Sequence, residues 1–521
     1  MLAFTGTTLP DATAARLRDA PAAGLTLFRY DNVDAPAQVR ELTDAAQRAR
    51  AAGRHAGPLL VAADQEGGQL IALGGGTTPF PGSMALGATG DLELTERVGQ
   101  ATGTEALAMG VNVVYAPSCD LATSPANPHL GIRSFGDDPR RVGAFAAAMV
   151  RGIRSAGAAA TIKHFPGLGE ADLDTHLGLP DLGFDEAQLA ARELVPFVAA
   201  IEAGADIVMS AHVALSPLTG SADLPATLAR EVMHDLVRGR LGFRGLTITD
   251  ALDMEALPQG DAQAIDAIAA LSAGNDLLLC VPDRNKTARI EASVAHAAAR
   301  RLFDPDALRA SDARLAGLRR RLADAPLPDL DLVGGVAHRA LAREVAERSI
   351  TFVRDHDGLL PLRLEPGASV LAVMPQPRAL TPADTSASVE PGLAAALRAH
   401  WPEVREIVTS HPPTDDDVAG VVAAAADATI TVVGTIAASA DPAQAALVDA
   451  LLAAGGPVVT VALRTPWDLG AYPRASTHVV AYGILGPTLV ALAATLFGER
   501  PFRGRLPVAL PAGLLDEVPV R

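Results

Sequence analysis

The sequence predicts an α/β protein: an N-terminal TIM-like (β/α)8 barrel followed by a smaller α/β sandwich domain. At 521 residues and 49 % hydrophobic content, the chain is long enough for two domains with separate cores. Short apolar runs alternate with Ala-rich amphipathic stretches up to about residue 325, and the alternation starts again at about residue 340. A Pro-Asp-Leu stretch lies between them. We expect the barrel at 1–325, a linker at 326–345 and the second domain at 346–521.

Seven apolar runs in the first part are predicted to be parallel strands, because the stretches between them suit crossover helices. Seven or eight such units favour a barrel, and on pattern alone a doubly wound sheet is the alternative. The strands are Gly24–Phe28, Leu59–Ala63, Asn112–Ala116, Ala158–Ile162, Asp206–Met209, Leu246–Thr249 and Asp276–Cys280. The helical stretches include Ala37–Ala52, Leu92–Met109, Val142–Ala156 and Glu186–Ala203.

The second domain shows the same alternation without a catalytic set of its own. No glycine fingerprint for a dinucleotide follows its first apolar run. We expect it to pack against the barrel and to form one wall of a cleft. Its predicted strands are Ser369–Val373, Ala428–Val433, Pro457–Leu463 and His478–Ala481, with a helix at Pro442–Ala454.

Charge and composition exclude several classes of partner. The formal net charge of −17 disfavours nucleic acid and anionic membrane surfaces. No run of about 18 apolar residues is present, and the first residues lack a signal-peptide pattern. Cys119 and Cys280 are far apart and fit no metal spacing, so we expect buried free thiols in a reducing compartment. The expected location is cytoplasmic, with no metal and no organic cofactor.

Polar side chains follow the predicted strands of the first domain. In a barrel these positions are loops of the carboxyl-terminal face, where active sites are built. The clustering is independent of any resemblance and predicts a site there. The residues are Asp64, Glu66, Asp120, Lys163, His164, His212, Asp250 and Asp253.

The stretch from 162 to 180, IKHFPGLGEADLDTHLGLP, carries the strongest chemical signal. Lys163 and His164 end a strand, and glycines and a proline then begin a loop. Asp174 and His176 are two residues apart, so in an extended loop both side chains leave on one face. A carboxylate beside an imidazole fixes its tautomer and makes a proton shuttle. Alone, such a pair is more often a solvated surface feature.

These motifs resemble the β-N-acetylglucosaminidases of glycoside hydrolase family 3. The chain has K-H-F-P-G-x-G at 163–169 followed by D-[ST]-H-x-x-x-P at 174–180. Before them come D-x-E-G-G and A-P-x-x-D…N-P…R-S-F-G, and after them comes ITDALDM. The resemblance covers most of the chain. It implies that Asp250 is the nucleophile and that the Asp174–His176 pair is the acid/base. It also implies that the sugar is held by Asp64, Arg133, Lys163 and His164, and His212 either lines the pocket or closes a loop.

Two positions depart from the family pattern. Leu168 stands where many members have a second histidine, and residues 69–72, QLIA, replace a stretch that usually contains a sugar-binding arginine. The arginine contact is therefore missing or supplied elsewhere. The loss of this arginine is the one feature that suggests a non-catalytic sugar-binding protein. Against that alternative, the nucleophile and the dyad are both present.

The resemblance implies a retaining exo-β-N-acetylglucosaminidase that works through a covalent glycosyl-enzyme and acts on a small GlcNAc-containing carbohydrate. Cell-wall muropeptides and chitin fragments are the two substrate classes that it suggests. A β-N-acetylglucosaminide phosphorylase is one alternative, since a neutral acid/base repels phosphate less than a carboxylate does. A β-glucosidase on the same barrel is the other.

Overall fold

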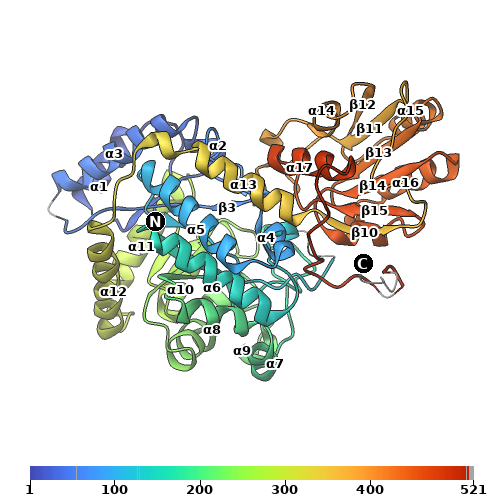
Figure 1. Ribbon diagram of the computed structural model, residues 1–521. Helices are drawn as coiled ribbons and strands as arrows, with labels where there is room; N and C mark the ends of the chain where they lie inside the picture. Colours follow the sequence, from blue (N-terminus) through green and yellow to red (C-terminus); the bar gives the residue numbers. More distant parts are fainter. Residues whose placement is uncertain (21, 54, 126, 128–129, 512, 516–521) are drawn as a thin grey trace.

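The computed structural model describes the chain except residues 21, 54, 126, 128–129, 512 and 516–521, and its first sheet is a nearly closed parallel barrel (Figure 1). All seven predicted strands are present, and they pair in chain order, which confirms the barrel over a doubly wound sheet. They are β1 (Gly24–Thr26), β2 (Leu60–Ala63), β5 (Val113–Val114), β6 (Ala159–Phe165), β7 (Ile207–Ser210), β8 (Leu246–Ala251) and β9 (Leu277–Leu279).

The eighth position of the barrel is occupied by the extended residues Met1 and Leu2. Leu2 forms a parallel bridge with Leu25 of β1. On the other side, Met1 donates its amino group to the Leu278 carbonyl at 2.7 Å and accepts from the Cys280 amide at 3.1 Å. The two edge strands are therefore linked through this segment, and their backbone groups are paired as a closed barrel requires.

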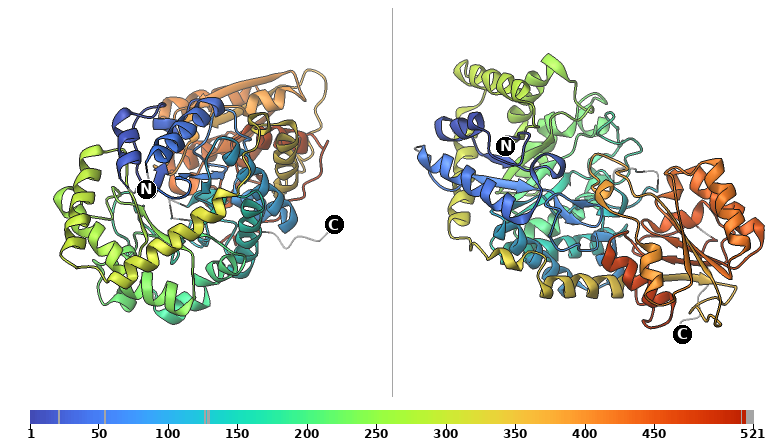
Figure 2. Two further views of the ribbon diagram at one scale, coloured as in Figure 1. Left: turned by 90° about the vertical axis from the view of Figure 1, so that its left-hand side faces the viewer. Right: turned by 90° about the horizontal axis from the view of Figure 1, so that it is seen from above.

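A ring of helices surrounds these strands, as seen end-on in the left view of Figure 2. They are α1 (Asp11–Asp19), α3 (Pro36–Ala52), α5 (Leu92–Ala108), α6 (Pro139–Ser155), α7 (Glu186–Ala191), α8 (Leu194–Glu202), a π-helix (Glu231–Arg240), α10 (Gln263–Ala273), α11 (Arg284–Ala299) and α12 (Pro305–Ala323). Shorter elements are α2 (Arg29–Asn32), α4 (Ser83–Thr89), α9 (Ser216–Thr219) and the hairpin β3 (Gln65–Gly67) with β4 (Leu70–Ile71).

The helix predicted at 186–203 is two helices, α7 and α8, and Pro196 explains the break. A proline ring clashes with the carbonyl four residues earlier and gives that carbonyl no N–H. That residue is Arg192, whose backbone leaves the helical region (φ −133°, ψ −75°). The chain therefore turns between the two helices.

The second domain is a six-stranded sheet in the order β10-β15-β14-β13-β11-β12, with only β10 antiparallel. Helices α14 and α17 contact each other, as do α15 and α16, and the two pairs cover opposite faces of the sheet (Figure 1). The sequence missed β10 and β12. The strands are β10 (Thr351–Asp355), β11 (Val370–Pro375), β12 (Val404–Thr409), β13 (Ile430–Thr435), β14 (Val458–Ala462) and β15 (Thr477–Val480), and the helices are α14 (Leu393–Arg398), α15 (Asp415–Ala426), α16 (Pro442–Ala454) and α17 (Gly486–Leu496).

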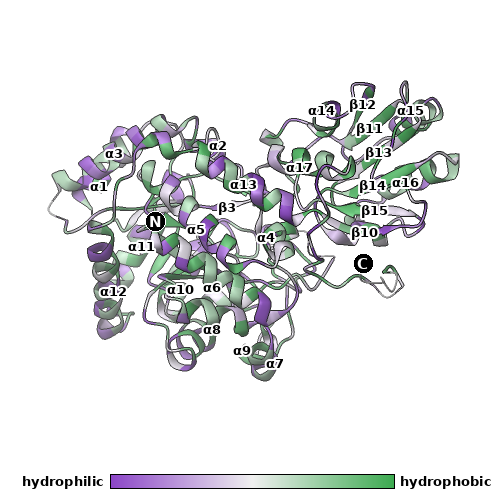
Figure 3. Ribbon diagram, viewed as in Figure 1, coloured by the Kyte–Doolittle hydropathy of each residue, from purple (hydrophilic) through white to green (hydrophobic). Residues whose placement is uncertain are grey.

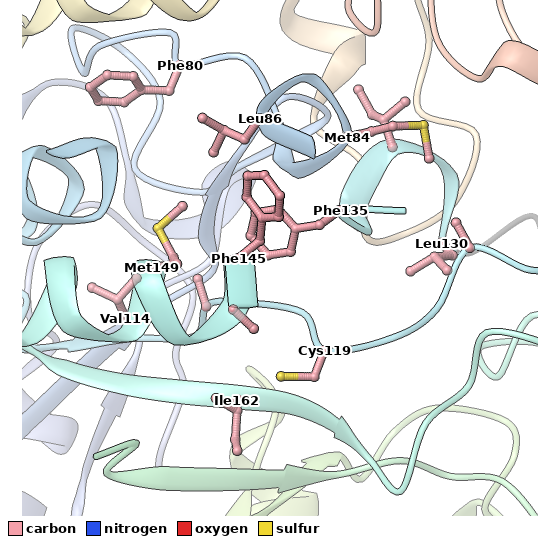
Figure 4. Close-up of a cluster of buried hydrophobic side chains, with 14 of the residues drawn as sticks. Phe80, Met84, Leu86, Val114, Cys119, Leu130, Phe135, Phe145, Met149 and Ile162 are labelled. Atoms are coloured by element: carbon pink, nitrogen blue, oxygen red, sulfur yellow. The ribbon is translucent and has the colours of Figure 1, made fainter. Parts of the chain in front are cut away.

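The strands of both domains are rich in hydrophobic residues, whereas helices such as α12 carry many hydrophilic ones (Figure 3), and the hydrophobic residues of the strands are mostly buried. In the barrel domain, one cluster packs between the strands and helix α6 (Figure 4). Phe135 and Phe145 stack there with ring centroids 5.5 Å apart. Cys119 belongs to the same cluster, and both cysteines are buried and free, as predicted.

Backbone hydrogen bonds among the described residues fasten the second domain to the barrel, and two groups of them lie near the cavity. Thr385 donates its backbone N–H to the Gln69 carbonyl at 2.7 Å, and its Oγ1 accepts from the Ile71 amide at 3.1 Å. Near the other end of the chain, the Pro507 carbonyl accepts from the Asp137 amide at 3.2 Å, and Asp137 in turn accepts from the Ala509 amide at 2.6 Å. Both contacts fall on loops of the carboxyl-terminal face of the barrel.

Helix α13 (Val336–Ser349) runs across the barrel and leads into β10 (Figure 1). It follows α12, which ends at Ala323, and contacts α4 and α5 of the barrel domain. The domain limits at 325 and 346 stay predictions. Among the described helices, none has the length and apolar character needed to cross a membrane.

Helix packing around the barrel predicts opposite effects for two glycine substitutions. Gly152 of α6 faces α5, and a Cβ there would overlap the Glu96 carbonyl oxygen and lie 2.9 Å from the Gly99 Cα. Gly152→Ala should therefore lower the free energy of unfolding by about 1–3 kcal/mol through overpacking, despite alanine's better helix propensity. Chemical denaturation measures it.

Gly420 of α15 is the matched control, because a Cβ there would meet nothing within 4 Å. Gly420→Ala should raise stability by about 0.4–1 kcal/mol, since only the helix propensity changes. Equal effects of the two substitutions would contradict the close packing of α5 on α6.

Candidate active site

A cavity of about 240 Å³ opens at the carboxyl ends of the barrel strands, where the polar residues were predicted to gather. Its wall contains six of the eight predicted site residues: Asp64, Arg133, Lys163, His164, His176 and Asp250. Pro382, Ala383 and Thr385 of the second domain line it as well. The expectation that this domain forms one wall of the cleft is confirmed.

A buried group of four charges forms one side of the cavity. Glu66 accepts from Arg133 through both carboxylate oxygens, at 2.8 and 2.9 Å, and lies 2.7 Å from the Lys163 ammonium. Lys163 also pairs with Asp64. Arg133 and Lys163 are each 1 % exposed, whereas Asp64 is 24 % exposed. Asp64 is therefore the member of the group that a ligand can reach most readily.

The three most buried members, Glu66, Arg133 and Lys163, are held in their ionised forms. Burial alone would raise the pKa of Glu66, but Arg133 and Lys163 outweigh it and hold that pKa far below its usual range. Burial would likewise lower the pKa of Lys163, but Asp64 and Glu66 raise it above its usual value. The cations consequently face the cavity with fixed positions and fixed charge.

The His164 ring lies between the carboxylate of Asp120 and the guanidinium of Arg133. Its Nδ1 lies 2.7 Å from Asp120, and its Nε2 lies 3.2 Å from an Arg133 nitrogen. Because the guanidinium can only donate, Nε2 accepts and Nδ1 carries the hydrogen shared with Asp120. Asp120 also accepts from the backbone amides of His164 and Leu168. One carboxylate thus orients the ring and the first turn of the following loop.

Asp250 ends the buried part of β8 and stands partly exposed in the cavity wall. Burial would raise its pKa, but the nearby His164 and His212 and a 2.8 Å hydrogen bond from the Ala251 amide lower it to about 2. The group is therefore a carboxylate over the whole ordinary pH range. Asp253 is exposed and does not line the cavity.

Asp174 and His176 form the predicted pair on the loop between β6 and α7. Asp174 Oδ1 lies 2.8 Å from His176 Nδ1 and accepts from the His176 backbone amide at 2.9 Å. The carbonyls of Thr175 and His176 accept from the amides of Ala256 and Glu255, at 3.2 and 3.4 Å. These bonds tie the loop to the segment that follows Asp250, and His176 lines the same cavity as Asp250.

Asp174 and His212 do not line the cavity. Asp174 acts from behind His176, with 5 % of its side chain exposed. His212 is fully buried; its Nδ1 lies 2.8 Å from Thr227 Oγ1 and its Nε2 donates to the Ala251 carbonyl at 3.1 Å. Of the two alternatives for His212, the structure shows the loop hydrogen bond, which holds the backbone beside Asp250.

Three features of this site were not predicted from the sequence: the partners of Glu66 and Asp120, Arg29, and the lining loop of the second domain. Glu66 and Asp120 were recognised as polar residues after strands, but their partners come from other loops. Arg29 lines the cavity from the loop after β1 and has no motif of its own. The lining loop of the second domain, 382–385, is distant in sequence. Leu168, at the position of the absent second histidine, is 1 % exposed in the apolar core.

Comparison with known proteins identifies both halves of the chain. Residues 3–309 match the model of the glycosyl hydrolase family 3 N terminal domain, and residues 350–520 match that of the C-terminal domain. The chain is 34 % identical over 381 residues to "Beta-hexosaminidase A" of Pseudoalteromonas piscicida, an alignment that covers 68 % of this chain and 63 % of that protein.

Two further relatives match over most of their length. "Beta-N-acetylglucosaminidase/beta-glucosidase" of Cellulomonas fimi is 30 % identical over 489 residues, covering 88 % of this chain and 85 % of that protein. A solved structure, a glycoside hydrolase family 3 beta-N-acetylglucosaminidase from Paenibacillus sp. str. FPU-7, superposes with a TM-score of 0.91 at 32 % identity and covers 97 % of this chain and 96 % of its own. The chain belongs to glycosyl hydrolase family 3.

Proposed function

We propose that the protein is a retaining exo-β-N-acetylglucosaminidase that hydrolyses terminal β-linked GlcNAc through a covalent glycosyl-enzyme. The observation that carries the proposal is the pairing of an ionised Asp250 with the Asp174–His176 pair in one cavity. Relatives named beta-hexosaminidase and beta-N-acetylglucosaminidase support it. Cell-wall muropeptides and chitin fragments are the candidate natural substrates.

Asp250 is the proposed nucleophile, because a carboxylate with a pKa of about 2 is always available to attack. One Asp250 oxygen bonds to the anomeric carbon as the glycosidic bond breaks, which gives a glycosyl ester. The cations of Lys163 and Arg133 and the carboxylate of Asp64 line the same cavity and would bind the sugar hydroxyls and the acetamido group.

His176 is the proposed acid/base. Asp174 holds the hydrogen on Nδ1, so Nε2 is the nitrogen that exchanges a proton with the reacting groups. In the first step protonated His176 gives this proton to the leaving oxygen. In the second it takes a proton from water, which attacks the anomeric carbon and releases Asp250. Two inversions at one carbon retain the anomeric configuration.

Arg29 is our candidate for the arginine contact that the 69–72 stretch lacks. It lines the cavity, and one guanidinium nitrogen is fixed by the Val33 carbonyl at 2.9 Å. This bond fixes one end of the planar guanidinium in the cavity wall. The departure from the family motif is therefore compatible with full sugar binding.

Two alternatives have specific support. The Cellulomonas fimi relative is named for glucosidase as well as glucosaminidase activity, so donor preference needs measuring. A phosphorylase is favoured by the cations Arg29, Arg133 and Lys163 in a cavity whose acid/base is an imidazole, since phosphate replaces water in the second step. The same assays separate all three functions.

Activity assays should show faster turnover of 4-nitrophenyl N-acetylglucosaminide than of the glucoside, with β-GlcNAc as the first product. Added phosphate should leave the rate unchanged and yield no sugar phosphate. A glucoside preference would establish the glucosidase, and GlcNAc-1-phosphate would establish the phosphorylase. NMR of the fresh reaction identifies the anomer.

Substitutions should separate the roles of nucleophile and acid/base. Asp250→Ala should abolish turnover of every glycoside, because no ester can form. His176→Ala should lose about 10²–10⁴-fold on N,N′-diacetylchitobiose, whose sugar alkoxide needs protonation, and less on the nitrophenyl glycoside. A glycosyl-enzyme should accumulate with the latter and be visible by intact mass spectrometry.

His296→Ala is the matched control, since His296 is exposed and does not line the cavity. This variant should keep wild-type turnover. An equal loss by His176→Ala on the two substrates, without a trapped intermediate, would remove His176 from the acid/base role.

Glu66→Gln should reduce both stability and substrate binding, because Arg133 and Lys163 would lose their shared anion inside the protein. Breaking a buried ion pair costs about 3–5 kcal/mol of folding free energy. The folded pKa of Glu66 lies below its ordinary value of 4.5, so its stabilisation is complete above pH 4.5 and declines as the pH falls.

Urea unfolding of wild type and Glu66→Gln at several pH values tests this charge dependence. The difference between the two proteins should be largest near neutral pH and shrink in acid. A difference independent of pH would mean that packing, rather than the carboxylate charge, stabilises the group.

A further inference from the structure

Tyr30 places an exposed aromatic ring in the wall of the active-site cavity. Of the chain's four tyrosines, all within the described residues, Tyr115, Tyr472 and Tyr482 are fully buried, whereas Tyr30 is 65 % exposed. Tyr30 lines the cavity together with its two chain neighbours. Ligand cavities bind the apolar parts of their ligands through such aromatic surfaces, so this ring needs a partner from outside the chain.

The described part of the chain provides no stacking partner for Tyr30. No aromatic ring or guanidinium stacks on it there, and its hydroxyl makes no hydrogen bond to a described residue. Burial and, after it, the nearby carboxylate of Asp384 raise the pKa of Tyr30 above its usual value. The ring therefore lies near the 382–385 loop of the second domain, which lines the same cavity.

The turn that carries Tyr30 is held by the fully buried side chain of Asn32. Asn32 Oδ1 accepts from the Phe28 amide at 3.0 Å, and its Nδ2 donates to the carbonyls of Phe4 and Gly6 at 2.8 and 3.0 Å. These bonds fix the backbone on both sides of Tyr30. Because the backbone is already ordered, little conformational entropy is lost when a ligand packs against the ring.

The neighbouring loop of the second domain is fixed as well, through the fully buried Asp384. Its carboxylate pairs with Arg464 at 2.8 and 3.2 Å. It also accepts from the backbone amides of Leu380 and Ser386, at 3.1 and 2.8 Å. Tyr30 and the 382–385 loop thus form a part of the cavity wall that is set before a ligand arrives.

Exposure separates the inner end of the cavity from its mouth. The charged side chains of Glu66, Arg133 and Lys163 are at most 3 % exposed and lie at the inner end. Tyr30, at 65 %, stands where the cavity opens to solvent. With the terminal sugar held by the charged group, the next ring of the glycoside extends towards the mouth.

We propose that Tyr30 is a specificity-determining residue that stacks on the sugar ring of the leaving group; this inference rests on the proposed function. The C–H face of a pyranose is apolar and weakly positive, and the face of an aromatic ring carries negative charge density. A second sugar therefore gains a contact at Tyr30 that a small alcohol cannot make. The residue would select glycosides whose leaving group is itself a sugar.

Two substrates with matched chemistry test the stacking. N,N′-diacetylchitobiose and methyl β-N-acetylglucosaminide both release an alkoxide that needs protonation, but only the first has a second ring. Tyr30→Ala should lower the ratio of their kcat/KM values, chitobiose over methyl glycoside, by about three- to tenfold. Tyr30→Phe should keep the wild-type ratio, because the ring remains and only the hydroxyl is lost.

Leu302→Ala is the matched control: Leu302 is also 65 % exposed but does not line the cavity, so both kcat/KM values should equal those of wild type. An unchanged ratio in Tyr30→Ala, including an equal loss on both substrates, would overturn the inference. So would an equal fall in Tyr30→Phe, which would assign the effect to the hydroxyl.

A binding measurement keeps this test separate from the proposed activity. If wild type turned over neither substrate, the proposed function would fail. Calorimetry of the same two ligands with full-length Asp250→Ala, with and without Tyr30→Ala, would still report the contact. Weaker binding of chitobiose alone supports the stacking, and equal binding by the two proteins rejects it.

Discussion

The charge balance around Glu66 is the interaction on which the cavity depends. Arg133 comes from the segment between β5 and α6 and Lys163 from strand β6, and each is 1 % exposed, so neither could remain charged there without an anion. Glu66 supplies this anion to both, and Asp64 completes the balance on the open side. One buried carboxylate thus fixes the positions of two cations in the wall of the cavity.

Other residues of the site also hold cavity-lining groups in place without lining the cavity themselves. Asp174, Asp120 and His212 contact no cavity space themselves, yet each fixes a group or a backbone segment that does. Rigid positioning matters because catalytic groups must keep their geometry while the charge on the substrate changes. The proposed glycosidase therefore depends on a second layer of residues as much as on the cavity wall.

Most of the barrel and its site could be predicted because both have local signals. At Ala63-Asp64 and Thr249-Asp250 a carboxylate directly follows an apolar run, and Asp174 and His176 are only two residues apart. Strands β10 and β12 were missed because both are edge strands with charged residues, as in VREIVT. Arg29 and Thr385 reach the cavity only through tertiary packing, which no local pattern records.

The return of the chain to the barrel at Pro507 and Ala509 has a consequence for biosynthesis. These residues bond to Asp137, four positions after Arg133, and Thr385 bonds to the hairpin after Asp64. A ribosome releases the barrel first, since domains fold as they emerge. The cavity wall contributed by 382–385, and the fastening of the Arg133 loop, can form only after residues 385 and 509, respectively, have been translated. Catalytic competence would thus arrive late, and a prematurely terminated chain would carry a barrel whose substrate cavity is open to water.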